Sequence, residues 1–467
     1  MHVVFVGGGA HRYLGVARSI LNDQAFEEPS SIRICDLDAH RAQVMATMIQ
    51  KTPEFVKANC TVQWDTDLAK LLPGADVVCV VIMAGGPVPF QRDMAICRAH
   101  GFVGSDQLSA SGAMLALRGG PILMNIAKQM QEHCPDAWLL DFANPVAVLS
   151  AAVNNHTAIR CLGVCAGYTN HQWDITRLLG EDAACNDYTI DSAGVNHLSF
   201  VLESSKVGKQ PIYDVLKDNI DDNWSMPALS SRWNESARAN ITRNVTRLKN
   251  IYQRFGQLVF SSEPDGLAHV ELAEHFHPIM QKPDLSQLTV DHASLEKDKA
   301  FRMEANNKFE TDSQTELSPT DWDTPDPERL YRLRDDENVM SLIITAIGSD
   351  QPKRIATSYL NHGAVDGFTD RTVLEYTQFI SRHGIKPAGQ YQIPPVFQGL
   401  ISGLAMHQTL LGDAIATRDP KVLFEACFNY PVFTDMPQSR WLWQSLIEHN
   451  AQAIGEELAQ AAKYFAG

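Results

Sequence analysis

The chain has 467 residues, 45% of them hydrophobic and 20% charged, which is the composition of a folded protein of two or three domains rather than a disordered or fibrous one. Its 39 Lys and Arg against 55 Asp and Glu give a net charge of −16, which argues against a protein that coats nucleic acid or an anionic membrane. No apolar run is long enough to span a bilayer, no secretory signal is visible, and nine scattered cysteines are typical of reduced thiols, so we expect a cytoplasmic protein.

Short apolar strands and amphipathic helices alternate through the first part of the chain. Strands are predicted at 3–6, 32–35, 62–64, 75–83 and 138–142, and helices at 13–22, 40–51 and 121–134. This alternation predicts a parallel sheet with right-handed crossovers, an α/β domain of the Rossmann type. We expect this domain to cover residues 1–195.

The pattern changes after residue 195. Long amphipathic stretches typical of helices occur at 237–255, 371–382, 395–411 and 441–465, whereas 284–324 is polar and resembles a loop. We therefore expect a helix-rich α+β second domain over residues 196–467, which would carry part of the substrate and metal site and the oligomer contacts.

A glycine turn follows the first predicted strand. Gly7 and Gly9, with Ala10 and His11, would let a pyrophosphate approach the backbone at the start of the next helix, although Arg12 stands where a third glycine is usual. Asp36 ends the second strand and can accept hydrogen bonds from a ribose diol, which favours NAD over NADP. The plainer interpretation is a tight turn with an acidic helix cap, and we favour the cofactor.

Asn144 precedes Pro145 at the end of a later strand, where ligands of open α/β sheets bind. Its side chain can bond a carboxamide or a sugar hydroxyl, although Asn-Pro is also a common turn. Cys165 follows another apolar segment, and His197 comes 32 residues later. Either residue alone is most often structural, but two ligands with an open coordination sphere suit a metal that chelates substrate.

Several motifs together resemble one family, the NAD- and divalent-metal-dependent glycosidases of glycoside hydrolase family 4 and its close relatives. The resemblance covers nearly the whole chain and rests on the glycine turn, the strand ending at Asp36, Gly163-x-Cys165, Gly194-x-Asn196-His197, Gly85-Gly86 with Asp93, Gly101-x-x-Gly104-Ser105-Asp106, Ala116-Leu117-Arg118, Asn144-Pro145, Asn361-x-Gly363, Gly384-Ile385-x-Pro387 and Thr409 to Asp413.

The resemblance implies an unusual hydrolysis. NAD takes a hydride from sugar C3, a base removes the acidified C2 proton, the aglycone leaves from C1, water adds, and the hydride returns. It also implies that Cys165 and His197 bind a divalent ion, expected to be Mn²⁺, and that Asn144 lies between cofactor and sugar.

The resemblance leaves the proton-transfer groups open. Asp106 is the candidate that assists the leaving group, and the base would be one of Tyr252, Glu263 and His269. Each has a plainer interpretation, since Asp106 suits a turn, Tyr252 a helix core and Glu263 a solvated loop.

The sugar is also open. Relatives that cleave phosphosugars have an arginine where Phe90 stands here, which disfavours a 6-phosphate and leaves hexosides, uronides and sulfosugars such as sulfoquinovose. Arg92 or Arg118 can pair with a carboxylate or sulfonate, and Asn196 is a further candidate substrate contact, although either arginine can simply brace a helix.

Two other classes of function remain. The N-terminal half also resembles lactate and malate dehydrogenases, so a sugar or hydroxy-acid dehydrogenase that releases NADH is the main alternative. An NAD-sensing regulator is the third, but it would leave Cys165 and His197 without a role. We expect a small glycoside as the substrate, neither nucleic acid nor membrane as a partner, and a homodimer or homotetramer.

Overall fold

The computed structural model describes residues 1–23, 26, 28–182, 187–220, 224–231, 233–271, 279–323, 330–335, 338–431 and 437–465. Six parallel strands begin the fold: β1 (His2–Val6), β2 (Ser30–Cys35), β3 (Cys60–Asp65), β4 (Val77–Val80), β5 (Trp138–Asp141) and β6 (Arg160–Gly163). Their spatial order is β3-β2-β1-β4-β5-β6, which is the doubly wound order of dinucleotide-binding domains. The α/β Rossmann-type sheet predicted from the sequence is confirmed.

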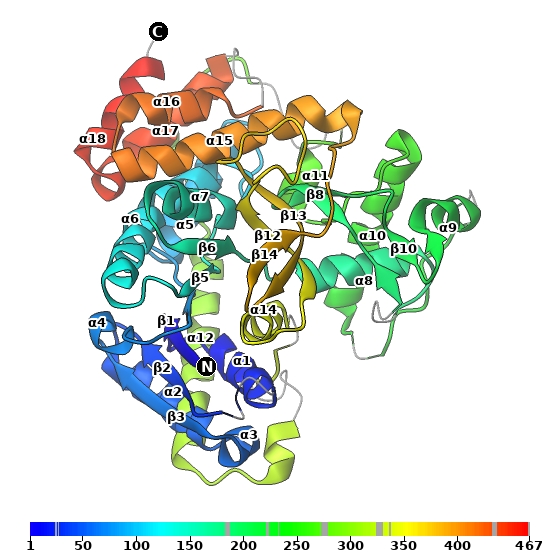
Figure 1. Cartoon of the computed structure of the whole chain (residues 1–467). Coiled ribbons are helices and arrows are strands. Elements are labelled where there is room, and N and C mark those ends of the chain that lie inside the picture. The colour runs from blue at the N-terminus through cyan, green and yellow to red at the C-terminus, as the bar shows by residue number, and fades with distance from the viewer. Residues whose placement is uncertain are drawn as a thin grey trace.

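The helices between these strands cover both faces of the sheet (Figure 1). They are α1 (Arg12–Leu21), α2 (Ala39–Gln50), α3 (Pro53–Lys57), α4 (Leu68–Leu71), α5 (Pro87–Ala99), α6 (Ala110–His133) and α7 (Val146–His156), and α8 (Tyr168–Leu178) follows β6. Alternate residues of β1 enter opposite cores: Val3 and Phe5 pack with α1 and α2, and Val4 and Val6 pack on the other face with α6. Burial on both faces explains the continuous apolar runs of the central strands.

The later part of the chain extends the same sheet. Among the described residues, eleven strands form it, because β12 (Lys353–Leu360), β13 (Val373–Ser381), β14 (Gly384–Pro387), β8 (Ser192–Val195) and β9 (Leu198–Val201) continue from β6. A small separate sheet contains β7 (Tyr188–Thr189), β10 (Lys206–Val207) and β11 (Gln210–Pro211). The boundary expected at residue 195 therefore falls at the end of β8, and the large sheet runs through it.

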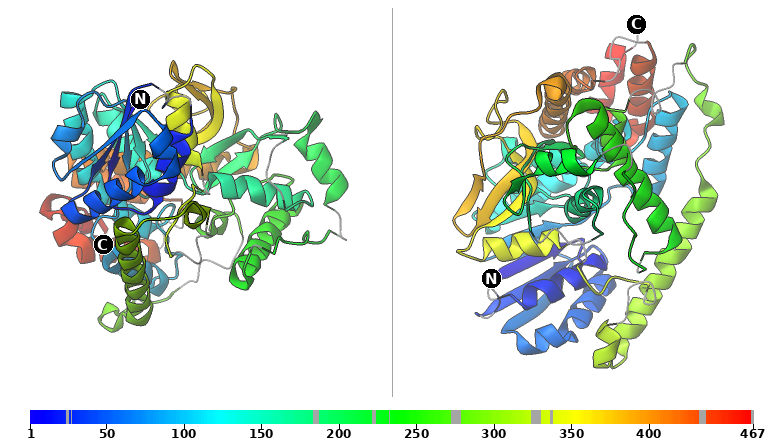
Figure 2. Two further views of the ribbon diagram at one scale, coloured as in Figure 1. Left: turned by 90° about the horizontal axis from the view of Figure 1, so that it is seen from below. Right: turned by 90° about the vertical axis from the view of Figure 1, so that its right-hand side faces the viewer.

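Helices dominate the remaining sequence, as expected. They are α9 (Ile212–Asn219), α10 (Glu235–Phe255), α11 (Pro264–Ala268), α12 (His292–Gln314), α14 (Val339–Ile347), α15 (Gln398–Thr417), α16 (Pro420–Phe428), α17 (Pro437–Ile454) and α18 (Glu456–Ala459). The C-terminal helices pack back onto α6 and α7, whereas α8 to α10 project from the other side (Figures 1 and 2). None of the described helices is long and apolar enough to cross a membrane.

Two predicted elements were wrong, and a third was predicted too short. The stretch 371–382 is strand β13 rather than a helix, because its β-branched and aromatic side chains are buried on both faces. The segment 284–324 contains helix α12, whose few buried side chains give almost no apolar periodicity. The helix expected at 121–134 begins at Ala110, where the Ser109 hydroxyl accepts a bond from Gly112 N, and Pro121 lies inside it.

Candidate active site

The carboxyl ends of the parallel strands collect the predicted site residues. The glycine turn follows β1, Asp36 follows β2, Asn144 follows β5 and Cys165 follows β6. Because parallel strands end at one edge of the sheet, these residues share one rim, which is where open α/β sheets bind ligands.

The glycine turn packs directly against β4 and β2. Gly7 has a φ of +70°, and a Cβ there would lie 2.1 Å from the Val81 carbonyl oxygen, so only glycine fits. Gly9 N donates to Asp36 Oδ2 at 2.8 Å, and Arg41 Nη2 donates to the Gly9 carbonyl at 2.9 Å. The turn is therefore held in shape by the chain itself, with the predicted ribose-binding acid beside it.

The two residues after the glycines lead into α1. Ala10 N donates to the Gly7 carbonyl at 3.0 Å, and the His11 ring packs on Phe309 of α12 with 4.5 Å between ring centroids. Burial, together with the positive charge of Arg41, lowers the pKa of His11 to about 4, so this ring is neutral at pH 7. Helix α12 thus lies against the first βα turn.

Strand register brings the metal candidates together. Gly163 pairs with Ser358, Ser358 with Glu375, and Glu375 with Gly194, so one row crosses β6, β12, β13 and β8. Cys165 lies two residues beyond one end of this row, and His197 lies three residues beyond the other, in the turn between β8 and β9. A pair that is distant in sequence thereby meets in space, and the Cys165 thiol is close enough to the His197 ring to act on its pKa.

His197 is held rigidly in an uncommon backbone conformation. Its φ is +68°, in the left-handed region that non-glycine residues rarely adopt and that recurs at functional sites. Its Nδ1 lies 2.8 Å from Asp265 Oδ1, and its carbonyl packs on Gly266, where a Cβ would come within 1.6 Å of the carbonyl oxygen. The ring nitrogen left over, Nε2, is the one available to a metal.

Charge and burial shift the pKa values of this cluster. Burial disfavours a charged His197, but Asp265 and Cys165 outweigh it and raise the pKa of the ring well above its ordinary value. Burial likewise opposes a charged Asp265, but His197 and the hydrogen bonds from Leu108 N and Ser105 hold the pKa of Asp265 well below its usual range. In Glu263, burial dominates and raises the pKa of the carboxyl group.

The residues present fit a divalent ion with open coordination positions. A thiol and an imidazole oriented through its other nitrogen form a suitable pair of ligands, and Asn196 Oδ1 is buried nearby without a partner among the described residues. Gly167 lets the His171 ring pack close to the sulfur, since a Cβ there would lie 2.7 Å from His171 Nε2 and 3.4 Å from Cys165 Sγ. In the described part of the chain no group of three or more His, Cys, Asp or Glu is arranged to hold a metal ion.

A second polar network lies beside this pair. Asn144 Nδ2 donates to Asp106 Oδ2, and Gln107 Nε2 donates to Asn144 Oδ1 at 2.7 Å. The last hydrogen bond of this network comes from Val146 N, which donates to Gln107 Oε1 at 3.2 Å. Both polar ends of the Asn144 side chain are therefore fixed, and its orientation is set before any ligand arrives.

The three candidate bases have different surroundings. Glu263 precedes α11, and its carboxyl group is close enough to His197 and Asp106 for their charges to act on its pKa. His269 is buried against the loop at 105–108, with its Nε2 3.5 Å from the Leu108 carbonyl oxygen, and burial lowers its pKa. Tyr252 is half-buried beside Tyr213, with 6.2 Å between ring centroids.

The two candidate substrate arginines also differ. Arg118 is buried, and its Nη1 donates to both Asp93 Oδ2 and Asn450 Oδ1 at 2.6 Å. Asn450 Nδ2 returns a bond to Asp93 Oδ1 at 2.7 Å, so the cluster joins α5, α6 and α17. Arg118 Nε and Nη2 have no partner among the described residues, whereas Arg92 is exposed on α5.

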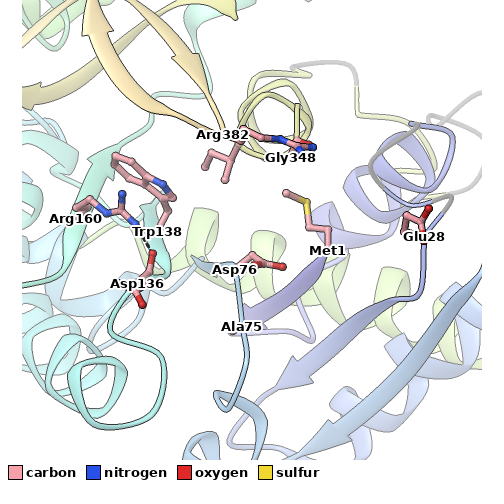
Figure 3. A pocket seen from close by; sticks show the side chains of 10 residues that line it. Met1, Glu28, Ala75, Asp76, Asp136, Trp138, Arg160, Gly348 and Arg382 are labelled. Atoms are coloured by element: carbon pink, nitrogen blue, oxygen red, sulfur yellow. Dashed lines mark hydrogen bonds between the residues drawn. The ribbon is translucent and has the colours of Figure 1, made fainter. Parts of the chain in front are cut away.

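A cavity of about 420 Å³ opens at the opposite edge of the sheet (Figure 3). It is lined by residues at the amino ends of the strands, among them Met1, Asp76, Trp138 and Arg160, and by Arg382. The Arg160 guanidinium covers the Trp138 ring at 4.2 Å from its centroid. None of the residues predicted to act in binding or catalysis lines this cavity.

Three polar residues of the rim were not singled out from the sequence. Asp265 holds His197, Gln107 holds Asn144, and His171 is buried beside the metal pair with its Nδ1 unpartnered among the described residues. Burial and the charge of His197 lower the pKa of His171 to about 3. Only His171 offered a local signal, since it follows Cys165 by six residues at the start of α8.

Known proteins share both the sequence and the fold. The chain is 24% identical to the α-galactosidase of Bacillus subtilis (strain 168) over 92% of each protein. It is 22% identical to the α-galacturonidase of Thermoanaerobacterium saccharolyticum over 97% of this chain and 96% of that one. A 6-phospho-α-glucosidase from gut microorganisms, solved in complex with NAD and Mn²⁺, has a TM-score of 0.71 at 19% identity and covers 97% of this chain and 98% of its own.

Two family models account for most of the sequence. The model described as family 4 glycosyl hydrolase matches residues 2–181, and the model of the C-terminal domain of that family matches residues 192–433. The resemblance drawn from the motifs is thereby confirmed: the chain belongs to family 4 of the glycosyl hydrolases and is a glycosidase.

Proposed function

We propose that this glycosidase depends on NAD and a divalent metal, and that it cleaves its substrate by transient oxidation and elimination rather than between two carboxylates. The observation that carries the proposal is the Cys165–His197 pair at the same sheet edge as the glycine turn. The structural relative solved with NAD and Mn²⁺ supports the same two cofactors here.

When bound, NAD would supply reversible hydride transfer to the sugar, and the ion would supply Lewis-acid stabilisation of the negative charge that develops on it. The thiolate of Cys165 and Nε2 of His197 would hold the ion, and Asn144 would orient the sugar against the nicotinamide. Gly7, Gly9, Ala10 and His11 would shape the pyrophosphate site, with Asp36 at the ribose.

The chain must also move two protons. We assign removal of the C2 proton to Glu263, because burial raises its pKa toward the range useful for proton transfer at neutral pH and because it lies near His197. Asp106, fixed by the Asn144 amide, would donate to the departing oxygen. His269 and Tyr252 are the alternative bases. Comparing the kcat of variants at Glu263, His269 and Tyr252 ranks the three candidates.

The sugar is proposed to lack a 6-phosphate. By the family resemblance, Phe90 stands where phosphosugar-cleaving relatives have an arginine. The relatives matched over nearly their whole length include an α-galactosidase and an α-galacturonidase, but also a 6-phospho-α-glucosidase, so the proposal rests on position 90. Arg92, Arg118 and Asn196 are the candidate substrate contacts. A hexoside, a uronide or a sulfosugar glycoside such as a sulfoquinovoside is therefore expected. We also propose a homodimer or homotetramer, which light scattering tests.

The test is release of nitrophenol from aryl glycosides, with and without NAD and Mn²⁺. We expect release that requires both additions, with no net accumulation of NADH. Steady NADH production would instead identify a dehydrogenase, and cofactor binding without turnover a sensor. A panel of galactoside, galacturonide, sulfoquinovoside and 6-phosphoglucoside identifies the sugar, and the best rate on the 6-phosphate would overturn our assignment.

A further inference from the structure

The Asp265 carboxylate is buried at the meeting point of three segments. Its Oδ1 accepts from His197 Nδ1 at 2.8 Å and from Gly266 N at 2.9 Å. Its Oδ2 accepts from Ser105 Oγ at 2.7 Å and from Leu108 N at 2.9 Å. One oxygen therefore holds the predicted metal ligand, and the other holds the loop at 105–108.

That loop carries the predicted leaving-group acid. Asp106 and Gln107 lie between the two anchor points and bond the Asn144 amide from both sides. The loop is closed on itself, since Ser105 N donates to Ser109 Oγ at 2.8 Å. Tyr430 Oη donates to the Leu108 carbonyl at 2.8 Å from the opposite side. Displacement at Asp265 would therefore reach Asp106 as well as His197.

We propose that Asp265 is a positioning residue with two contacts: one oxygen orients His197 toward the metal, and the other fixes the loop at 105–108 that carries Asp106. The proposal rests on the metal-dependent function proposed above. An imidazole that donates its Nδ1 hydrogen to a carboxylate presents the Nε2 lone pair outward, which is the arrangement that metal-binding histidines generally need.

Asp265→Asn keeps the shape of the side chain, but its one carbonyl oxygen cannot accept hydrogen bonds on both sides as the two carboxylate oxygens do. If its oxygen faces Ser105 and Leu108, its amide faces His197 and favours the tautomer with a hydrogen on Nε2, which blocks the metal. If its oxygen faces His197, the amide points at the Leu108 N–H, which then loses its acceptor. Either arrangement damages one of the two functions assigned to Asp265.

The test measures Mn²⁺ affinity directly, by the electron paramagnetic resonance signal of free Mn²⁺, in the purified full chain. If the asparagine amide faces His197, we expect Asp265→Asn to weaken Mn²⁺ binding by about 10–100-fold, as loss of such outer partners typically does. If its oxygen faces His197, we expect normal Mn²⁺ affinity with a lower kcat. NAD binding, followed by nicotinamide-dependent quenching of protein fluorescence, should stay within about twofold, since metal affinity and not the fold is what changes.

A matched control lies elsewhere in the fold. Asp413 Oδ1 pairs with His156 Nε2 at 2.8 Å between α15 and α7 and also accepts from Arg371 Nη2 at 2.5 Å. Asp413→Asn therefore removes a carboxylate from a His–Asp pair remote from the proposed metal site. We expect this variant to bind Mn²⁺ as the unmodified chain does. A purely structural role for Asp265 would lower the melting temperature of both variants and leave the Mn²⁺ affinity and kcat of both unchanged, which would overturn the proposal.

A second variant covers the case in which Asp265→Asn does not fold. Ser105→Ala removes one bond to Oδ2 and leaves the His197 contact in place. We expect unchanged Mn²⁺ affinity with a lower kcat, and unchanged kcat would overturn the proposal. If the unmodified chain binds no Mn²⁺, the metal-dependent function itself fails, which is a different outcome from a variant that binds normally.

Discussion

Two buried carboxylates join distant segments of this molecule, and they do so with different partners. Asp93 faces Arg118 and Asn450, which close it into a cluster between three helices. Asp265 faces His197, whose ring reaches Cys165 at the rim of the sheet. In the first cluster both oxygens of Asp93 are bonded within the protein, although Arg118 Nε and Nη2 have no partner among the described residues. The second cluster ends on a thiol and an imidazole, which we propose to be metal ligands. We therefore expect the Asp93 cluster to matter mainly for stability and the Asp265 cluster mainly for the proposed metal site.

Cys165→Ser is the sharpest way to test the second cluster. We expect metal-dependent glycosidase activity to fall by roughly a thousandfold or more, equivalent to about 4 kcal/mol in the barrier, because a hydroxyl is a poor replacement for a thiolate ligand. Far-ultraviolet circular dichroism and NAD binding should be unchanged. Full activity in this variant would remove the metal assignment.

Arg118→Met tests the first cluster. Removing one partner of a buried ion pair leaves the other without compensation, so we expect a loss of about 3–5 kcal/mol in the free energy of unfolding, measured with urea. Arg92→Met is the control, because Arg92 is exposed, and its free energy of unfolding should stay within about 0.5 kcal/mol of that of the unmodified chain. A KM change in either variant, measured with the best glycoside, reports a contact with substrate.

Added Mn²⁺ should distinguish the two clusters in one experiment. At a free concentration of about one hundred times Kd, binding to the folded state adds about 2.7 kcal/mol to its stability. We expect this gain in the unmodified chain and in Arg118→Met, but not in Cys165→Ser. A gain of the same size in Cys165→Ser would place the ion elsewhere.

Gly266→Ala tests how closely the metal ligand is seated. The new Cβ would collide with the His197 carbonyl oxygen, so the turn must shift, and overpacking of this kind costs about 1–3 kcal/mol. Mn²⁺ affinity should fall together with the melting temperature. Gly399→Ala on α15 has open space around its Cβ and is the neutral control.

The parts of the molecule that sequence patterns predicted are those built from neighbours in the chain. The glycine turn and Asp36 belong to one βαβ unit, and the strand order follows from helices that alternate with strands. Strand β13 was mistaken for a helix because burial on both faces removes the alternation that identifies a strand. Helix α12 was missed because it is polar on nearly all sides.

The metal cluster shows why the rest was out of reach. Asp265 contacts His197 and Ser105, which lie 68 and 160 positions away in the sequence. The local sequence around an acidic loop residue carries no pattern that predicts contacts so distant. Spacing alone gave only weak support for pairing Cys165 with His197, and the resemblance to a known family made them the proposed metal ligands. Their meeting depends on the register of four strands, two of which come from beyond residue 350.

Asn450 has a consequence for how the protein is made. This side chain completes the Asp93–Arg118 cluster, yet it belongs to α17, so the first half of the chain leaves the ribosome long before its last buried partner is synthesised. We therefore expect the nascent N-terminal half to need chaperone protection, and a chain that stops before α17 to be a target for cellular proteases rather than a working fragment.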